Sequence, residues 1–205
     1  MNGLFPLAAW GRCADALADA ALLRWGHWLG GCRRPFGRQS FGLWLGGELA
    51  AVAVSASTVN AAYAGYRRQE VVELARLCSH PDHRDLTRVA LRLWRVTAAQ
   101  EWSARYWAVR AYVAYSNRLR HNGDVYRFDG WRKAADVPGG TAGGNWSRAK
   151  KYDPKAVWVF PLDDNAGPPP RPGRRPALRG GPREVCDLRR RLPRSLPESG
   201  SLLQR

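Results

Sequence analysis

Residues 40–55, SFGLWLGGELAAVAVS, constrain the fold of this 205-residue chain more than any other stretch. Two apolar runs are joined by Gly46-Gly47. A glycine pair between apolar runs is typical of a tight β-hairpin, because glycine adopts the positive φ angles that such a turn requires. The sequence therefore predicts two antiparallel strands at this point.

Helical and strand patterns alternate on both sides of the hairpin. Residues 12–25 are rich in Ala and Leu, with acids near the start and Arg24 near the end, which suits a helix and its dipole. The later predictions are a strand at EVVELARLC (70–78), a helix within 80–102, a strand at WAVRAYVAYS (107–116), a short helix at GDVYRFDG (123–130), an edge strand at WRKAADV (131–137) and a strand at AVWVF (156–160). This order indicates an α/β or α+β fold built in layers.

The composition changes towards the C-terminus. Residues 166–205 contain ten Arg and only three acids, with many prolines and hardly any aromatic side chains. Such a composition cannot bury a core and is typical of disorder. We therefore expect one domain over residues 1–165, followed by a disordered basic tail over residues 166–205.

The charge and the cysteines indicate the setting and the partners. The net charge is +16, of which +7 lies in the tail and +9 in residues 1–165. This excess favours a nucleic acid or a phosphorylated cofactor as partner, although a solvated basic surface explains it equally well. The four cysteines show no CxxC spacing, and charges interrupt the apolar N-terminal stretch, so we expect a reduced, cytoplasmic protein without a signal peptide or membrane contact.

Two segments have the composition of a nucleic-acid-binding surface. GGTAGGNWSRAKKYDPK combines flexible glycines, cations and aromatic rings that can stack on a base, and GGCRRPFGRQ adds further arginines. The alternative is a pair of basic surface loops whose aromatic rings fix them to the body of the protein. The candidate nucleic-acid contacts are Arg33, Arg34, Arg38, Trp146, Arg148, Lys150 and Lys151.

The order of strand, HPDHRDLTRVALRL, strand and VYRFDGW resembles the second half of the GCN5-related N-acetyltransferase (GNAT) fold. In that superfamily, Arg or Gln followed by two glycine-type positions holds the pyrophosphate of acyl-CoA at a helix N-terminus. The resemblance implies cofactor contacts from Arg84, Thr87 and Tyr115. It departs from the pattern at Thr87 and Val89, where a Cβ intrudes on the turn, so the donor is either acyl-CoA held differently or a molecule that the sequence does not identify.

The same loop has a simpler explanation. Ser79, Asp82 and Asp85 are candidate N-cap residues for the helix that follows. A compact Cys78-x-His80-x-x-His83 also has ligand types that suit zinc or iron, but a fourth ligand would have to come from a distant segment and Pro81 makes the geometry awkward. We therefore expect no metal site.

VYRFDGW keeps a second GNAT spacing, in which a tyrosine precedes a Gly-aromatic pair. The resemblance implies that Tyr126, ahead of Gly130-Trp131, delivers a proton to the CoA thiolate. A phenol suits this task because it stays protonated at neutral pH and hydrogen-bonds a developing thiolate.

A narrower resemblance, over about residues 40–137, links VVELARL and AYVAYSNRLRHNGDVYRFDGWRKAADV to the Mom-type phage DNA-modification proteins and their bacterial relatives. It implies a GNAT-like fold without the glycine-rich loop, and modification of the exocyclic amine of adenine in DNA. The positions carried over are Glu73, Arg76, Tyr115, Asn117, His121, Gly123 and Tyr126.

The general base stays open between two residues. Asn117 replaces the aspartate of the Mom-type pattern, and an amide cannot act as a base. Either Glu73 or His121 takes this role, or the chain has different or no catalysis. Glu73 would need a pKa raised by partial burial, and an ion pair with an arginine is the alternative. Arg76 has the opposite strand parity, so we expect it on the other face of the sheet.

Three functions fit these observations. The first is an acyltransferase-like enzyme that modifies an amine, with a nucleobase amine in DNA as the candidate acceptor. The second is a non-catalytic nucleic-acid-binding accessory protein of the same fold, and the third is an N-acetyltransferase for small molecules or proteins.

Overall fold

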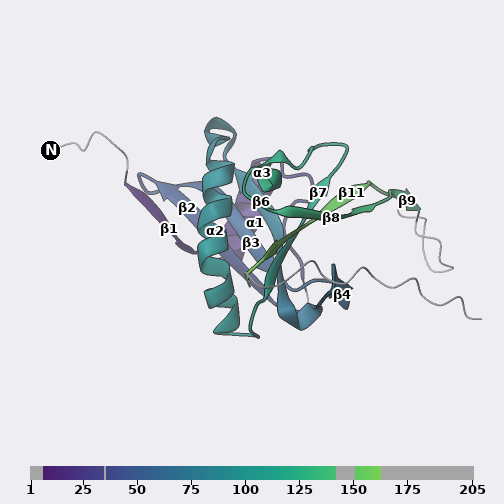
Figure 1. The fold of residues 1–205 in the computed structure, drawn as a ribbon. Helices are drawn as coiled ribbons and strands as arrows, with labels where there is room; N and C mark the ends of the chain where they lie inside the picture. Colours follow the sequence, from purple (N-terminus) through teal and green to yellow (C-terminus); the bar gives the residue numbers. More distant parts are fainter. Residues whose placement is uncertain (1–6, 35, 142–150, 163–205) are drawn as a thin grey trace, which may run out of the picture. The chain divides into compact units, whose positions relative to one another are not determined.

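The computed structural model describes residues 7–34, 36–141 and 151–162, which are built around a seven-stranded mixed sheet (Figure 1). The strand order is β1-β2-β3-β6-β7-β11-β8. The strands are β1 (Ala8–Arg12), β2 (Arg38–Leu45), β3 (Glu48–Ala56), β6 (Val71–Ser79), β7 (Ala111–Asn117), β8 (Arg132–Val137) and β11 (Lys155–Pro161). Neighbouring strands are antiparallel except β6 and β7, which are parallel. A mixed sheet with flanking helices confirms the predicted fold class.

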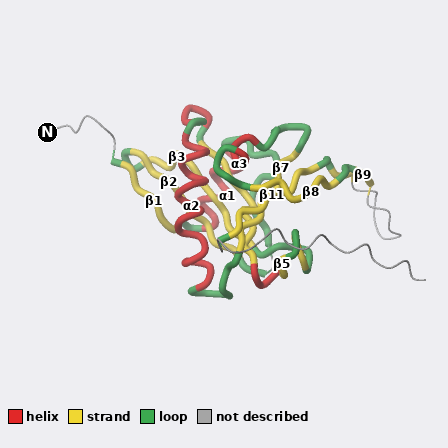
Figure 2. Tube along the Cα trace, in the orientation of Figure 1, coloured by secondary structure: helices red, strands yellow, loops and turns green. Residues whose placement is uncertain are grey.

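One long helix covers each face of the sheet (Figure 2). α1 (Asp15–Arg24) packs on β2 and β3, and we call its side the α1 face. α2 (Leu86–Ser103) packs on β2, β3 and β6 on the α2 face, where Trp94 and Trp102 are fully buried. The Trp94 Nε1–H donates to Ser55 Oγ at 2.8 Å, so the only polar atom of this indole is satisfied inside the core. Among the described residues, no helix is both long and apolar enough to cross a membrane.

The predicted hairpin is confirmed. β2 and β3 pair along their whole length, and the turn between them consists of Gly46 and Gly47 with φ angles of +58° and +89°. Side chains other than glycine rarely adopt such angles, which is why the glycine pair identified the turn. The strands at 70–78, 107–116, 131–137 and 156–160, and the helices at 12–25, 80–102 and 123–130, are also present, with shifted ends.

Several elements differ from the expectation. β1 was not predicted, and neither was the small hairpin of β4 (Ala62–Tyr63) and β5 (Tyr66–Arg67), which a 3₁₀ turn, η1 (Arg68–Glu70), connects to β6. The segment predicted as a loop after Val137 forms the short strands β9 (Gly140–Thr141) and β10 (Lys151–Tyr152). β11, the last strand in the sequence, inserts between β7 and β8, so that β8 is an edge strand as predicted. The proposed tail, residues 166–205, lies outside the described residues.

Candidate functional site

The two parallel strands at the centre of the sheet pair over only part of their length. β6 and β7 are in register from Val71 opposite Ala111 to Leu74 opposite Ala114, and both strands then continue without pairing to each other. Residues 75–79 of β6 are half-buried, although β6 is the middle strand of the sheet. We call this place the β6–β7 divergence. Its unpaired strand edges and accessible side chains allow a ligand to approach the centre of the fold.

A β-bulge marks the start of the divergence. On the β3 side, Leu74 lies opposite Ser55 and Arg76 lies opposite Val54, which leaves Ala75 as an extra residue in β6. The bulge reverses the side-chain alternation of the strand. Glu73 and Arg76 therefore both point to the α1 face, since their partners Ala56 and Val54 belong to the cluster that packs under α1. The expectation that Arg76 faces the other side of the sheet was wrong for this reason.

Glu73 lies on the α1 face immediately before the bulge. It is 3% exposed, and its Oε1 accepts a 2.6 Å hydrogen bond from Nη2 of Arg34, which comes from the segment between α1 and β2. Burial raises the pKa of Glu73, while the charges of Arg34, Arg76 and Lys155 act in the opposite direction. Glu73 thus combines the two predicted alternatives. It is a buried carboxyl with a raised pKa, as a general base requires, and it also forms an ion pair with an arginine.

Tyr126 approaches the divergence from the α2 face. It lies on α3 (Asp124–Arg127), a single helical turn, and its ring packs at 5.3 Å from Trp131 and 5.8 Å from Trp158. The side chain is buried, and its hydroxyl makes no hydrogen bond with any described residue. Burial raises the pKa of this phenol, and the negative charge of Glu73 contributes in the same direction. Tyr126 is therefore a protonated donor without a partner, within electrostatic reach of Glu73.

A carboxylate that the sequence patterns did not reveal, Asp153, lies beside the end of β7. Asn117 is 2% exposed; its Nδ2 donates to Asp153 Oδ2 at 2.7 Å, and its Oδ1 accepts the Leu119 N–H at 2.9 Å. An amide in this position cannot take a proton, but it holds the Asp153 carboxylate beside it. His121, the other candidate base, is exposed on the loop that follows β7.

The predicted cofactor contacts do not lie together. Tyr115 is on the same face of the sheet as Glu73, because it follows Val113, the register partner of Glu73, by two residues. Its ring contacts Tyr63 edge-on at 5.8 Å. Arg84 and Thr87 lie instead at the start of α2.

The start of α2 lacks both a glycine turn and a side-chain cap. Thr87 Oγ1 is hydrogen-bonded to Ser79 Oγ at 2.8 Å, and the N-cap residue Asp85 makes no cap hydrogen bond, so the proposed capping roles of Ser79 and Asp85 are wrong. Exposed arginines surround this helix end, and Asp85, Arg88, Val89 and Arg92 line a shallow hollow beside it. The ring of Phe128 is 59% exposed and lies 6.0 Å from the Arg88 guanidinium carbon and 4.6 Å from that of Arg127.

The sequence could have indicated this cationic surface. Arg84, Arg88 and Arg92 recur every four residues, which places them on one side of a helix. The apolar residues of this segment predict the helix, and the spacing of its arginines predicts the charged side of the same helix.

The candidate nucleic-acid contacts fall into three groups. Arg38 donates to Asp19, Asp15, Ser40 and the carbonyl oxygen of Cys32, and its side chain is 12% exposed, so it fixes α1 to β2, and its role as a nucleic-acid contact stays a prediction. Arg34 pairs with Glu73, and Arg33 is exposed nearby. Trp146, Arg148 and Lys150 lie outside the described residues, as does the side chain of Lys151.

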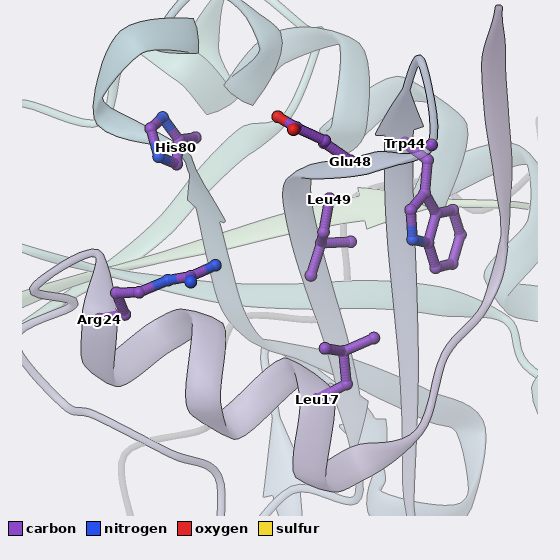
Figure 3. A pocket seen from close by; sticks show the side chains of 7 residues that line it. Leu17, Arg24, Trp44, Glu48, Leu49 and His80 are labelled. Carbon is purple, nitrogen blue, oxygen red and sulfur yellow. The ribbon is translucent and has the colours of Figure 1, made fainter.

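A separate hollow of about 620 Å³ lies on the α1 face at the other end of β3 (Figure 3). Glu48 and Leu49 line it at the start of β3, whereas Glu73 pairs with Ala56 at the end of the same strand. Arg24 and His80 point into this hollow from α1 and from the end of β6. Neither Glu73 nor Tyr126 reaches it, so we place the functional site at the β6–β7 divergence.

A mixed sheet whose central parallel strands separate, with helices on both faces, is the fold of the GCN5-related N-acetyltransferases, and the comparisons with solved structures agree. A candidate acetyltransferase from Acinetobacter baylyi is similar with a TM-score of 0.53 and 14% identity, over 82% of this chain and 98% of that one. A second candidate acetyltransferase, from Salmonella typhimurium and solved with acetyl-CoA, is similar with a TM-score of 0.53 and 15% identity. The match covers 78% of this chain and 97% of that one.

A third similar structure is the Salmonella typhimurium acetyltransferase that modifies the N-terminal serine of ribosomal protein L7/L12, with a TM-score of 0.51 and 8% identity, over 76% of this chain and 95% of that one. No protein-family model matches the sequence, and no curated protein matches it. At these identities the similarity establishes the fold.

Proposed function

We propose that this protein is an acyltransferase that moves an acyl group from a CoA thioester to an amine. The observation that carries the proposal is the placement of Glu73 and Tyr126 on opposite faces of the β6–β7 divergence, where they interact electrostatically. One is a buried carboxyl with a raised pKa, and the other is a buried phenol that stays protonated. These properties match a general base and a general acid in the same reaction.

A bound acyl-CoA would supply the activated acyl carbon and a sulfur leaving group. Glu73 takes a proton from the amine nitrogen as this nitrogen bonds to the acyl carbon. Tyr126 gives its phenolic proton to the sulfur as the carbon–sulfur bond breaks. The phenolate then regains a proton and Glu73 releases one, so an amine and a thioester become an amide and a thiol.

The residues around the start of α2 fit the phosphate groups of such a donor through side chains. The uncapped first turn of α2 leaves backbone N–H groups and a favourable dipole for an anion. The side chains of Thr87 and Val89 keep a pyrophosphate further from the backbone than glycines would. Arg84, Arg88 and Arg127 would hold the phosphates by charge, and the exposed ring of Phe128 offers a stacking surface.

For the acceptor, we propose the exocyclic amine of adenine in DNA. The resemblance to the Mom-type proteins supports this acceptor, and so do the half-buried cations close to the divergence, Arg34 and Lys155. The nucleobase would have to leave the base stack, since its amine must reach the middle of the sheet.

The test is a nucleoside profile of DNA from cells that express the protein, measured by mass spectrometry after complete digestion. A new modified adenosine in the wild type that disappears with Tyr126→Phe is the expected result. An unchanged profile, together with acetyl-CoA-dependent acylation of a small amine or a peptide in vitro, would replace DNA by another acceptor and support the third function. No transfer to any of these acceptors would refute the enzyme.

The ion pair between Arg34 and Glu73 favours a second candidate, a non-catalytic nucleic-acid-binding protein, because the base is already engaged. This candidate predicts salt-dependent DNA binding that survives Tyr126→Phe and Glu73→Gln and weakens when Lys150 and Lys151 are neutralised. An enzyme predicts that the two catalytic substitutions abolish transfer.

A further inference from the structure

The buried carboxylate of Glu73 lies in a strongly positive environment on the α1 face. The charged groups that act on it are Arg34, Arg76 and Lys155, three cations against one carboxylate, and only Arg34 is paired with it. An acceptor amine must enter this environment to reach Glu73. Like charges repel at short range in a partly buried site, so an alkylammonium group would be disfavoured here.

Arg76 makes part of this positive charge permanent. Its Nε donates to the carbonyl oxygen of Gly30 at 3.1 Å and its Nη2 to that of Gly31 at 3.0 Å, while its Nη1 donates to the carbonyl oxygen of Ala75. These neutral acceptors fix the guanidinium without cancelling its charge. The site therefore keeps a cation whatever Arg34 does.

Arg34 is held much less firmly. Among the described residues, its one hydrogen bond runs from Nη2 to Oε1 of Glu73, and its side chain is 20% exposed, compared with 4% for the Glu73 side chain. The guanidinium therefore has access to solvent on one side and to the carboxylate on the other. Such a group exchanges one anionic partner for another without becoming a buried unpaired charge.

Aromatic rings border the same site. Tyr63 interacts electrostatically with both Glu73 and Arg34, and its ring contacts that of Tyr115 at 5.8 Å. Both side chains are half-buried, so part of each ring is available. A flat ring that carries an amine can pack against such surfaces.

We propose that the acceptor of this site is an amine that also carries phosphate, as in a nucleotide, and that Arg34 moves from Glu73 to this phosphate when the acceptor binds. The inference rests on the proposed function. Before binding, Arg34 blocks the carboxylate; after the exchange, the carboxylate is free to take the proton of the amine. Arg34 is then a positioning residue that exposes the base only when an anionic acceptor is present.

The experiment compares AMP with adenosine, which differ only in the phosphate, by calorimetric titration of the full chain without acyl-CoA. We expect the wild type to bind AMP about tenfold more tightly than adenosine, since a charge-assisted contact is added. Glu73→Gln frees Arg34, so it should tighten AMP binding about tenfold further and leave adenosine binding unchanged. Arg34→Gln should remove the preference for AMP, and Arg105→Gln, at an exposed arginine near the end of α2, should not.

A structural ion pair predicts the opposite for Glu73→Gln, namely unchanged or weaker AMP binding, and this result would overturn the proposal. Equal binding of AMP and adenosine to the wild type would do the same. The double variant Arg34→Gln with Glu73→Gln leaves a neutral pair and checks the result if Arg34→Gln alone does not fold. The titration measures binding and not acyl transfer, so the two proposals can fail separately. If the expected binding pattern is found but no acyl transfer is detected, the acyltransferase is refuted and the exchange of Arg34 between anions is not.

Discussion

Two buried tyrosines on the α2 face, Tyr112 and Tyr126, differ in the hydrogen bonds that their hydroxyl groups make. The Tyr112 hydroxyl donates to the carbonyl oxygen of Arg95 at 2.6 Å and accepts the Ala99 N–H at 3.1 Å, and burial raises the pKa of this phenol to about 12. Tyr126 is buried as well, but its hydroxyl makes no hydrogen bond with the described residues. Because, within the described part of the chain, the Tyr126 hydroxyl makes no hydrogen bond that stabilises the fold, its presence fits a role other than folding.

Tyr126→Phe should therefore separate activity from stability. The phenylalanine keeps the contacts with Trp131 and Trp158 and removes the unpaired hydroxyl, so the free energy of unfolding should stay within about 1 kcal/mol of the wild type or rise. Acyl transfer should fall at least about 100-fold, since a general acid is lost. Tyr112→Phe is the matched control and should cost about 1 to 2 kcal/mol with little direct effect on transfer. Urea unfolding and the release of CoA thiol measure the two effects; a clear loss of stability in Tyr126→Phe would contradict the assignment.

For single residues, the sequence predicted which residues belong to the candidate site better than it predicted the direction in which their side chains point. Glu73 and Tyr126 lie where the resemblance implied, on the central strand and on the short helix. The shared face of Glu73 and Arg76 was not predictable from alternation, because the bulge at Ala75 depends on pairing with β3. The carboxylate of Asp153 was missed because it is 36 residues from Asn117 in sequence, and only the pairing of β11 with β7 brings the two together.

Among the elements, α3 sets the position of Tyr126 and depends on Gly123. The carbonyl oxygen of Gly123 accepts the N–H groups of Tyr126 and Arg127 at 3.0 and 3.1 Å, and its φ is +83°. A Cβ at this position would overlap the indole of Trp158. α3 is therefore held in place by a residue that must lack a side chain.

Gly123→Ala should lower the free energy of unfolding by about 2 to 4 kcal/mol, because a strained backbone and a steric overlap add. Gly130→Ala has the same φ of +83° but its Cβ would lie 3.8 Å from Phe160, so only the backbone strain remains. This control should lose about 1 to 2 kcal/mol. Equal losses in urea unfolding would show that the contact with Trp158 is unimportant.

Asp129 connects the turn after α3 to α2. Its carboxylate accepts the Trp131 Nε1–H at 3.1 Å and pairs with Nε of Arg92 at 3.1 Å and Nε of Arg95 at 3.2 Å, with the Asp129 side chain 2% exposed. Asp129→Ala leaves these donors without their acceptor and should lower the free energy of unfolding by about 2 to 4 kcal/mol. Asp129→Asn should lower it by about half as much, because the amide oxygen still accepts from Trp131. Asp136→Asn, at an exposed ion pair with Lys133, should change the stability much less than either Asp129 variant, because solvent screens this pair. Thermal unfolding distinguishes the three.

The order of the elements was predictable where the signal is local. The hairpin turn and the apolar spacing of α2 are contained in short windows of sequence. The position of β11 between β7 and β8 follows from which strand edges remain free after the others have paired, and no short window contains this information. β1 was missed because AAWGR is short and lacks the branched residues that mark strands.

At the scale of the whole molecule, the segment between α1 and β2 connects stability to the site. This segment contains His27 and Arg34 and provides the carbonyl oxygens of Gly30 and Gly31 for Arg76. Nδ1 of His27 accepts the Leu29 N–H at 3.3 Å, which requires the neutral ring. Burial lowers the pKa of His27 to about 4, and the positive charges of Arg76 and His121 act in the same direction.

The fold should therefore lose stability as the pH falls from about 6.5 to about 4, because the unfolded chain binds a proton on His27 in this range and the folded chain does not. The loss from this residue is at most about 3 kcal/mol. Glu73 acts in the opposite direction, since its raised pKa favours proton uptake by the folded state, so the wild type alone does not isolate His27. The difference in unfolding free energy between wild type and His27→Gln should shrink across this range. A constant difference for His27→Gln would mean that its ring takes up a proton without opening the segment that holds Arg34.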